Sequence, residues 1–325
     1  MRPTRHPENQ ACALVNLGTL RILLIVNSFA SSVTPKNTVL VHQHLARNHD
    51  VQVVETNERG HATRFAQDAA ARGLDAVVAF GGDGTLNEVA TGLAGSNTAL
   101  AMLPGGSTNV FVRTLGISND PMVALTQLEG AIERNEIERV SLGKANGRYF
   151  GFHAGIGYDA AVVEQVERRS SFKRLIGQPL FAYAALQQWF VGYSRKFPHF
   201  TMDVDGRKIP NGFFSVVLNT NPYTYVGKYP IHLSNAASLE KKLVAVTFRK
   251  MTTPLILRTL YSALRRGGLR PSGGIDIATD VDRVKFTFPA PFPYQLDGDY
   301  LGETTTLEIE HCEDALLLVR PRGEF

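Results

Sequence analysis

The segment richest in candidate chemistry is Gly81-Gly82-Asp83-Gly84-Thr85-Leu86-Asn87-Glu88-Val89. It follows the apolar run Asp75–Phe80, which predicts a buried strand, and it leads into a helical pattern. Three glycines let a backbone turn sharply and approach a ligand closely. Free amides at the start of the next helix suit a phosphate group. We therefore predict that this loop binds phosphate and that Asp83 contacts Mg²⁺.

A second polar loop, Pro104-Gly105-Gly106-Ser107-Thr108-Asn109, follows the predicted strand Ala99–Leu103. Its last three side chains are neutral hydrogen-bonding groups. The carboxyl ends of parallel strands meet at one edge of a sheet, so both loops are expected at the same ligand. Neither loop has the P-loop pattern. Backbone amides and Mg²⁺ would therefore manage the phosphate charge.

A third candidate is the turn Asp297-Gly298-Asp299 near the end of the chain. Carboxylates two residues apart across a glycine can face one cleft, where one of them could accept the proton of a hydroxyl nucleophile. The alternative is a tight hairpin in which Asp297-Gly298 is only turn chemistry. The sequence does not separate the roles of Asp297 and Asp299.

The pattern of elements predicts two domains. Strands at 21–26, 51–55, 75–80 and 99–103 alternate with helical segments, which predicts an α/β domain with a doubly wound parallel sheet. Beyond about residue 140, strands dominate, at 148–152, 200–204, 213–218, 243–248, 283–288 and 305–309. Helical segments at 160–190 and 254–266 interrupt them. We predict a flexible leader at 1–18, a nucleotide domain at 19–140 and a sandwich-like domain at 141–325, whose end could return to the first domain.

Composition limits the possible partners. The 325 residues carry a formal net charge of +4, which suits anionic partners such as nucleotides or anionic lipids. Two cysteines without metal or disulfide spacing fit a reducing, cytoplasmic setting. No stretch approaches the ~20 apolar residues of a membrane span, so membrane contact would be peripheral. Nucleic-acid binding has no motif to support it.

Together, Gly81–Val89 and Pro104–Asn109 resemble the catalytic domain of the diacylglycerol kinase family, which includes bacterial lipid kinases and sphingosine kinases. Thr56 with Gly60-His61-Ala62, the segment Gly155–Ala160 and the late Asp-Gly-Asp turn resemble further family features in the same order. The resemblance implies the fold type shared by NAD kinases and diacylglycerol kinases. It also implies a nucleotide domain, a β-sandwich lipid domain and an active site in the cleft between them.

The resemblance also implies site residues. Asp299 or Asp297 would act as the general base, and Asp83 would contact the metal. The candidate ATP contacts are Asn27, Ser28, Phe29, Ala30, Ser31, Thr56, Gly81, Gly82, Asp83, Gly84, Thr85, Leu86, Asn87, Glu88, Ser107, Thr108 and Asn109. The chain departs from the family at Asn27–Ser31, where a proline and a glycine are replaced, and at Asp299, where the family has glutamate.

The activity that the resemblance implies is ATP-dependent phosphorylation of a lipid hydroxyl, with diacylglycerol as acceptor and phosphatidic acid as product, in phospholipid biosynthesis. The alternatives are a sphingoid base, phosphatidylglycerol or NAD as acceptor, or an inactive regulator that binds nucleotide or lipid. A homodimer is left open.

We further expect a cytoplasmic protein that docks on the inner face of the membrane through basic and aromatic residues of the second domain. The basic members are Arg168, Arg169, Lys173, Arg174, Arg195, Lys196, Arg265, Arg266 and Arg270, and the aromatic ones are Phe172, Phe181, Tyr183, Trp189, Phe190 and Phe197.

Overall fold

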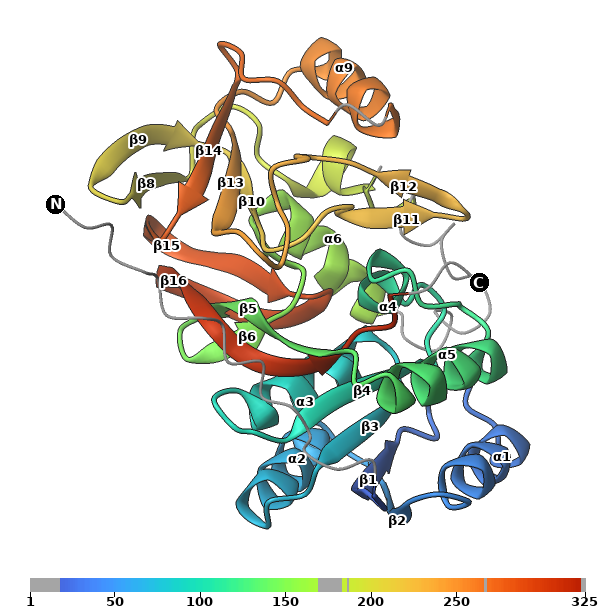
Figure 1. Cartoon of the computed structure of the whole chain (residues 1–325). Helices are drawn as coiled ribbons and strands as arrows, with labels where there is room; N and C mark the ends of the chain where they lie inside the picture. The colour runs from blue at the N-terminus through green and yellow to red at the C-terminus, as the bar shows by residue number, and fades with distance from the viewer. Residues whose placement is uncertain (1–17, 169–182, 186, 266–267, 323–325) are drawn as a thin grey trace, which may run out of the picture.

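The computed structural model describes residues 18–168, 183–185, 187–265 and 268–322 (Figure 1). The predicted leader lies outside the described residues except for Gly18. Several residues of the expected membrane-docking set also lie outside them, namely Arg169, Phe172, Lys173, Arg174, Phe181 and Arg266.

The first domain is built on four parallel strands in the order β2-β1-β3-β4. They are β1 (Arg21–Val26), β2 (Asp50–Glu55), β3 (Ala76–Gly81) and β4 (Ala99–Pro104). Every residue of β3 and β4 is buried, as expected for strands covered on both faces. Helix α2 (His61–Ala71) packs with α3 (Asp83–Leu93), and α1 (Pro35–Leu45) packs with α5 (Pro121–Glu133), one pair on each side of the sheet (Figure 1).

The helix starts of this domain are not alike. Thr34 caps α1 by accepting the Asn37 amide, and Asp120 caps α5 by accepting the amides of Met122 and Val123. Helix α3 has Gly82 as its N-cap residue and no side-chain cap. The first amides of a helix have no partner within it, so those of α3 meet the glycine loop without a capping side chain, while the Asp83 carboxylate of the first turn offsets part of the positive dipole end.

The second domain is mainly antiparallel. Its main strand order is β14-β13-β10-β7-β15-β16. The strands are β5 (Ile137–Ala145), β6 (Arg148–Phe150), β7 (His153–Ile156), β8 (Phe200–Val204), β9 (Arg207–Gly212), β10 (Phe214–Leu218), β13 (Leu243–Phe248), β14 (Ile275–Val281), β15 (Arg283–Leu296) and β16 (Asp299–Val319). A separate hairpin pairs β11 (Thr224–Val226) with β12 (Tyr229–Ile231). Further helices among the described residues are α4 (Val110–Thr114), α6 (Tyr158–Glu167), the π-helix η1 (Gln188–Gly192) and α9 (Thr253–Leu264).

Strand β16 connects the two domains. It pairs with β15 and β5 in the second domain, and its end pairs in parallel with β4 of the first, Leu318 opposite Leu100. Leu316–Val319 are buried in the hydrophobic core of the first domain. The predicted fold class, a parallel α/β domain with a mainly β second domain, is confirmed. Within the described residues, no helix combines the length and hydropathy that crossing a bilayer requires.

Candidate active site

The two predicted glycine loops lie against each other, backbone to backbone. The Gly105 amide donates to the Gly81 carbonyl at 2.7 Å. A Cβ on Gly105 would lie 2.7 Å from the Gly81 Cα, and one on Gly82 would lie 3.5 Å from the Gly106 Cα. Real Cβ atoms do not approach a backbone carbon to 2.7 Å, so the close contact of the loops requires glycine at position 105.

Beside these loops the structure has an open cavity of about 230 Å³. Its walls come from the ends of β1 and β2, the starts of α2 and α3, and the start of β16. The residues that line it are Asn27, Phe29, Thr56, Asn57, Glu58, Arg59, Ala62, Gly84, Thr85, Glu88 and Asp299. The cavity therefore brings Asn27, Phe29, Thr56 and the glycine loop together with the late Asp-Gly-Asp turn, more than 200 residues away in the sequence.

The loop after β1 is held in place by Asn27. Its Nδ2 donates to Thr85 Oγ1 at 2.9 Å, and its Oδ1 accepts the Phe29 amide at 3.1 Å. Phe29 has 59% of its surface exposed and forms part of the cavity wall. Ser28 and Ser31 are exposed and Ala30 is half-buried, and none of these three lines the cavity.

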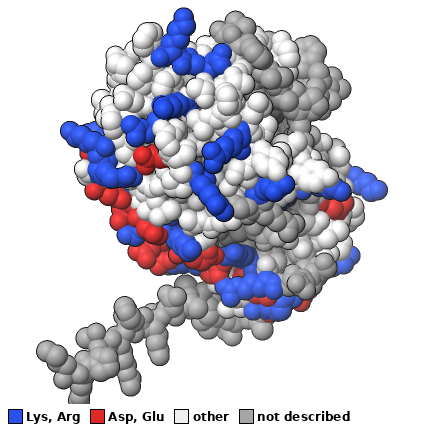
Figure 2. All heavy atoms as spheres, turned by 90° about the horizontal axis from the view of Figure 1, so that it is seen from above, with Lys and Arg blue, Asp and Glu red and all other residues white. Residues whose placement is uncertain are grey.

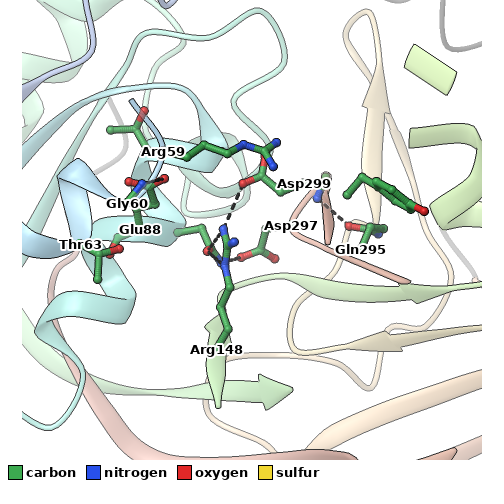
Figure 3. A network of polar contacts seen from close by, with 12 residues as sticks. Arg59, Gly60, Thr63, Glu88, Arg148, Gln295, Asp297 and Asp299 are labelled. Carbon is green, nitrogen blue, oxygen red and sulfur yellow. Dashed lines mark hydrogen bonds and ion pairs between the residues drawn. The ribbon is translucent and has the colours of Figure 1, made fainter. Parts of the chain in front are cut away.

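Glu88 joins α3 to the start of α2 (Figure 3). Its carboxylate accepts the amides of Gly60 at 2.9 Å and Ala62 at 3.1 Å, while its carbonyl accepts the Thr63 hydroxyl at 3.0 Å. Gly60 has φ +83 and precedes the first residue of α2, so Glu88 serves as the cap that α2 lacks from its own N-cap. This contact explains why the Gly60-His61-Ala62 segment lies at the cavity.

Asp83 lies between the two glycine loops and the start of α4. Its Oδ2 accepts the Val110 amide at 3.0 Å and its Oδ1 accepts the Phe111 amide at 3.1 Å. A carboxylate at the N-terminus of a short helix satisfies amides that the helix leaves unpaired. The carboxylate thus fixes the second loop relative to the first, and its role as a metal ligand stays a prediction.

The second loop is closed by Asn109. This residue is buried, has φ 47, and bonds Gly106 twice, accepting its amide and donating to its carbonyl, both at 2.8 Å. Ser107 is exposed and Thr108 is half-buried. The loop thus presents Ser107 at the surface, while the Asn109 side chain is turned into the protein. Leu86 is buried in the core of the first domain.

Asp297 and Asp299 flank a tight turn between β15 and β16, with Asp297 at φ 50 and Gly298 at φ 82. Asp297 is buried, and four N–H groups donate to its carboxylate. They are the amides of Gly151 at 2.6 Å, Phe152 at 2.9 Å and His153 at 3.0 Å, and Asn87 Nδ2 at 2.8 Å. Burial raises the pKa of Asp297, and these hydrogen bonds oppose that rise.

Asp299 has a different environment. It lines the cavity, and its Oδ1 lies 3.1 Å from where a Cβ on Gly84 would stand. Arg148 Nη2 donates to Asp299 Oδ2 at 3.1 Å, and Arg59 Nη2 lies 4.0 Å from Oδ1 (Figure 3). Of the two carboxylates in the turn, the one that reaches the cavity is therefore Asp299.

Arg148 on β6 was not singled out from the sequence. Its guanidinium donates to Asn87 Oδ1 through Nε at 3.0 Å and through Nη2 at 2.9 Å, besides its bond to Asp299. Asn87 in turn donates to Asp297. One arginine and one asparagine therefore connect α3 to both aspartates. An isolated arginine before Tyr149-Phe150 gives no sequence signal for this role.

A partly buried chain of polar side chains supports the turn from the other side. The Tyr223 hydroxyl bonds Asp159 Oδ1, Gln295 Nε2 donates to Asp159 Oδ2 at 2.6 Å, and Gln295 Oε1 accepts the Gly298 amide at 2.7 Å. Burial, followed by the nearby Asp159 charge, raises the pKa of Tyr223 well above its usual value, so this phenol stays a donor.

Arg59 crosses the cleft between the domains. From the loop before α2 it contacts Glu167 at the end of α6, with Nη2 at 3.1 Å from Oε1 and 3.2 Å from Oε2. Glu167 Oε1 also accepts the amide of Tyr300, the residue after Asp299. The pair thus links the nucleotide side of the cavity to the strand that carries Asp299.

Comparison with known proteins finds similarity to lipid kinases. Residues 21–145 match the model of the diacylglycerol kinase catalytic domain. The diacylglycerol kinase of Bacillus subtilis is 28% identical over 75% of this chain and 77% of its own length. A protein of Alcanivorax borkumensis named "Probable lipid kinase YegS-like" is 24% identical over 93% of this chain and 97% of that protein.

Two further similarities differ in extent. A protein of Streptococcus pneumoniae named "Putative lipid kinase" is 37% identical, but the match spans 33% of this chain and 35% of that relative. A solved diacylglycerol kinase structure from Bacillus anthracis matches with a TM-score of 0.67 and 21% identity, over 92% of this chain and 96% of that one. This likeness shows the shared fold. The match to the diacylglycerol kinase catalytic domain therefore covers residues 21–145, and the Alcanivorax borkumensis relative extends the similarity to 93% of the chain.

Proposed function

We propose that this protein transfers the γ-phosphoryl group of ATP to the hydroxyl of a membrane lipid, with diacylglycerol as acceptor and phosphatidic acid as product. The observation that carries the proposal is the position of Asp299, which lies beside Gly84 of the glycine loop in a cavity that also receives the uncapped start of α3. A proton acceptor and a phosphate-binding loop thus share one cavity.

In the proposed reaction Asp299 accepts the proton of the lipid hydroxyl while the oxygen of that hydroxyl forms a bond to the γ-phosphorus. The bond from that phosphorus to the β-phosphate oxygen breaks, and ADP leaves. Asp297, whose oxygens accept four N–H groups, holds the turn in place. We assign the proton transfer to Asp299 because a base must lie within reach of its substrate, and this is the carboxylate that lines the cavity.

The cavity walls fit a nucleotide. The backbone of Gly81–Gly84 and the α3 terminus would hold phosphates, and the exposed Phe29 ring offers an apolar surface to a base. Within the described residues, no group of three or more His, Cys, Asp or Glu is arranged to hold a metal. Mg²⁺ needs only one or two carboxylates beside substrate phosphates. Asp83 is the predicted ligand, and its two oxygens accept the amides of Val110 and Phe111 in this structure. When bound, the ion would neutralise charge on the transferring phosphoryl group.

A labelled-ATP assay with Mg²⁺ tests the proposal on acceptors in mixed micelles: diacylglycerol, monoacylglycerol, ceramide, sphingosine and phosphatidylglycerol, with NAD as the soluble acceptor. Labelled phosphatidic acid that disappears in Asp299→Asn is the expected result. Transfer of the label to NAD would mean that the acceptor is a soluble molecule and not a lipid. Nucleotide binding without any product would favour the inactive regulator.

A further inference from the structure

Helix α9 is apolar on the side that faces solvent. Four large side chains at positions i, i+3, i+4 and i+7 form a continuous stripe along it. Their exposed fractions are 62% for Leu257, 53% for Leu260, 57% for Tyr261 and 51% for Leu264. Large exposed apolar groups that are contiguous, rather than scattered, mark a surface that contacts something else.

The opposite side of α9 already supplies its packing. Leu255, Ile256 and Ala263 pack into the core cluster that contains Phe214 and Phe248. The fold therefore does not use the outer stripe. Helix α9 thus carries apolar side chains on both its packed side and its solvent side.

The hairpin next to α9 also exposes apolar side chains. Helix α9 contacts β12, and the His232 amide after β12 donates to the Ala263 carbonyl at 2.8 Å. The tip of this hairpin exposes Val226 to 55% and Tyr229 to 61%. We call the α9 stripe and this tip together the α9 surface. It combines a helix and a hairpin from separate parts of the chain.

The sequence that contains α9 is basic. From position 249 to 275 the sequence contains no Asp or Glu and six basic residues, Arg249, Lys250, Arg258, Arg265, Arg266 and Arg270. The Arg265 guanidinium lies 4.6 Å above the Tyr261 ring. Figure 2 views the molecule from the end where α9 lies in Figure 1, and shows Lys and Arg among uncharged residues while Asp and Glu gather toward one edge.

We infer that the α9 surface docks on a lipid bilayer that contains anionic lipid. An apolar stripe with basic residues around it suits such an interface, where the stripe enters the headgroup region and the cations meet anionic headgroups. A second copy of the chain fits less well, because pairing two α9 surfaces would bring the same positive charges together. The inference deepens the proposed lipid-kinase function by naming the element that meets the membrane.

The inference revises the expected membrane-docking residues. Trp189, expected at the membrane, is buried in the core, and Arg195 lies over its ring at 4.2 Å. Phe197 and Tyr183 are exposed, at 72% and 54%. The apolar stripe on α9 was not anticipated, because leucines at helical spacing ordinarily predict a buried face.

The test is flotation of the whole protein, without nucleotide, with vesicles of phosphatidylcholine alone or with phosphatidylglycerol added. The Leu257→Ser/Leu260→Ser protein is expected to bind the anionic vesicles at least about tenfold more weakly than wild type, because it loses two insertable side chains. Arg258→Gln/Arg265→Gln is expected to lose the preference for anionic vesicles. The matched control, Val39→Ser/Val123→Ser, alters apolar residues of similar exposure on α1 and α5 and should bind like wild type.

Equal binding by wild type and the leucine variant would overturn the inference. So would a concentration-dependent dimer, seen by sedimentation without vesicles, that the leucine changes abolish. Vesicle binding is measured without turnover, so its outcome is separate from the kinase assay. A protein that phosphorylates no lipid but docks through α9 would refute the proposed activity and keep the docking surface. A protein that phosphorylates lipid but docks without α9 would keep the proposed activity and refute the docking surface.

Discussion

Asp297 and Asp299 stand two residues apart in one turn, yet their carboxylates meet opposite surroundings. Asp297 is buried among four N–H donors, whereas Asp299 faces the cavity and contacts Arg148. A substitution should therefore have different effects at the two positions, and two experiments separate them.

At the cavity, Asp299→Asn should lower kcat by at least ~100-fold, because the amide cannot accept the proton of the acceptor hydroxyl. The free energy of unfolding should change little, since the side chain is partly exposed. Kinase assays and chemical unfolding measure both quantities. Asp314→Asn alters an exposed aspartate of positive φ within β16 and is the matched control. Unchanged turnover in Asp299→Asn would refute the assignment of the base.

In the interior, Asp297→Asn should lower the free energy of unfolding by about 3 kcal/mol, because an amide nitrogen would face N–H donors that now bond a carboxylate oxygen. Urea unfolding followed by circular dichroism measures the loss. A variant as stable as wild type but inactive would instead assign the proton transfer to Asp297.

His153 makes stability depend on pH. Burial lowers the pKa of His153 below its usual 6.5, although the nearby Asp159 and Asp297 oppose this shift. The unfolded chain therefore takes up the proton first as pH falls, and stability is lost as pH drops below about 6.5, by up to about 1.4 kcal/mol per pH unit. His153→Gln should remove this component. If the unfolding free energies of the two proteins fell equally between pH 7 and pH 5, the prediction would be contradicted.

The sequence predicted which residues meet at the site better than it predicted what each one does. Gly84 and Asn27 could be predicted because their motifs follow parallel strands whose ends share an edge. Asp299 could be predicted from its Asp-Gly-Asp turn and the family resemblance. The different surroundings of Asp297 and Asp299 could not be predicted from the sequence. They depend on partners such as Asn87 and Gly151, which lie far away in the sequence. Arg59 and Arg148 belong to no recognisable pattern, and their roles follow only from the folded chain.

At the scale of elements, the contact between the glycine loops should be intolerant of a methyl group. Gly105→Ala would place a Cβ 2.7 Å from both the Gly81 Cα and Val33 Cγ2. We expect a loss of about 1–3 kcal/mol in unfolding free energy. The KM for ATP should also rise, because the loop moves. Denaturation and initial-rate kinetics measure the two effects.

The control for this experiment is Gly273→Ala. A Cβ there would meet no heavy atom within 4 Å, and Gly273 lacks a positive φ. It should stay within about 0.5 kcal/mol of wild type. Equal effects of the two substitutions would mean that the methyl group at position 105 is accommodated without displacing the loop.

Elements with continuous apolar runs could be predicted closely from the sequence. Strand β1 matches its predicted bounds, since an uninterrupted buried run in a parallel sheet has a clear start and end. Helix α5 was missed although Asp120-Pro121 is a capping signal followed by a first-turn proline. Strands β15 and β16 run well beyond their predicted bounds, because their bulges and exposed stretches interrupt the apolar alternation.

At the scale of the molecule, Arg59 and Glu167 connect the two domains across the cavity. Arg59 is 63% exposed, so the pair should contribute no more than about 1 kcal/mol to stability. Its effect on kcat/KM should be larger, because it fixes the distance between the nucleotide side and Asp299. We expect Arg59→Gln and Glu167→Gln each to lower kcat/KM by roughly three- to tenfold, with the double variant no worse than the poorer single one.

A double-mutant cycle on both quantities checks this. Additive losses in kcat/KM would show that the two residues act separately.

Strand β16 begins with the carboxylate that faces the cavity and ends beside β4 in the sheet of the other domain. During synthesis on the ribosome, the β4 edge of that sheet therefore stays unpaired until more than 200 further residues have been made and β16 is present. An uncovered strand edge is a template for pairing with other chains. The nascent first domain is thus exposed to aggregation until residues near Leu318 emerge, and its completion coincides with delivery of Asp299 to the cavity.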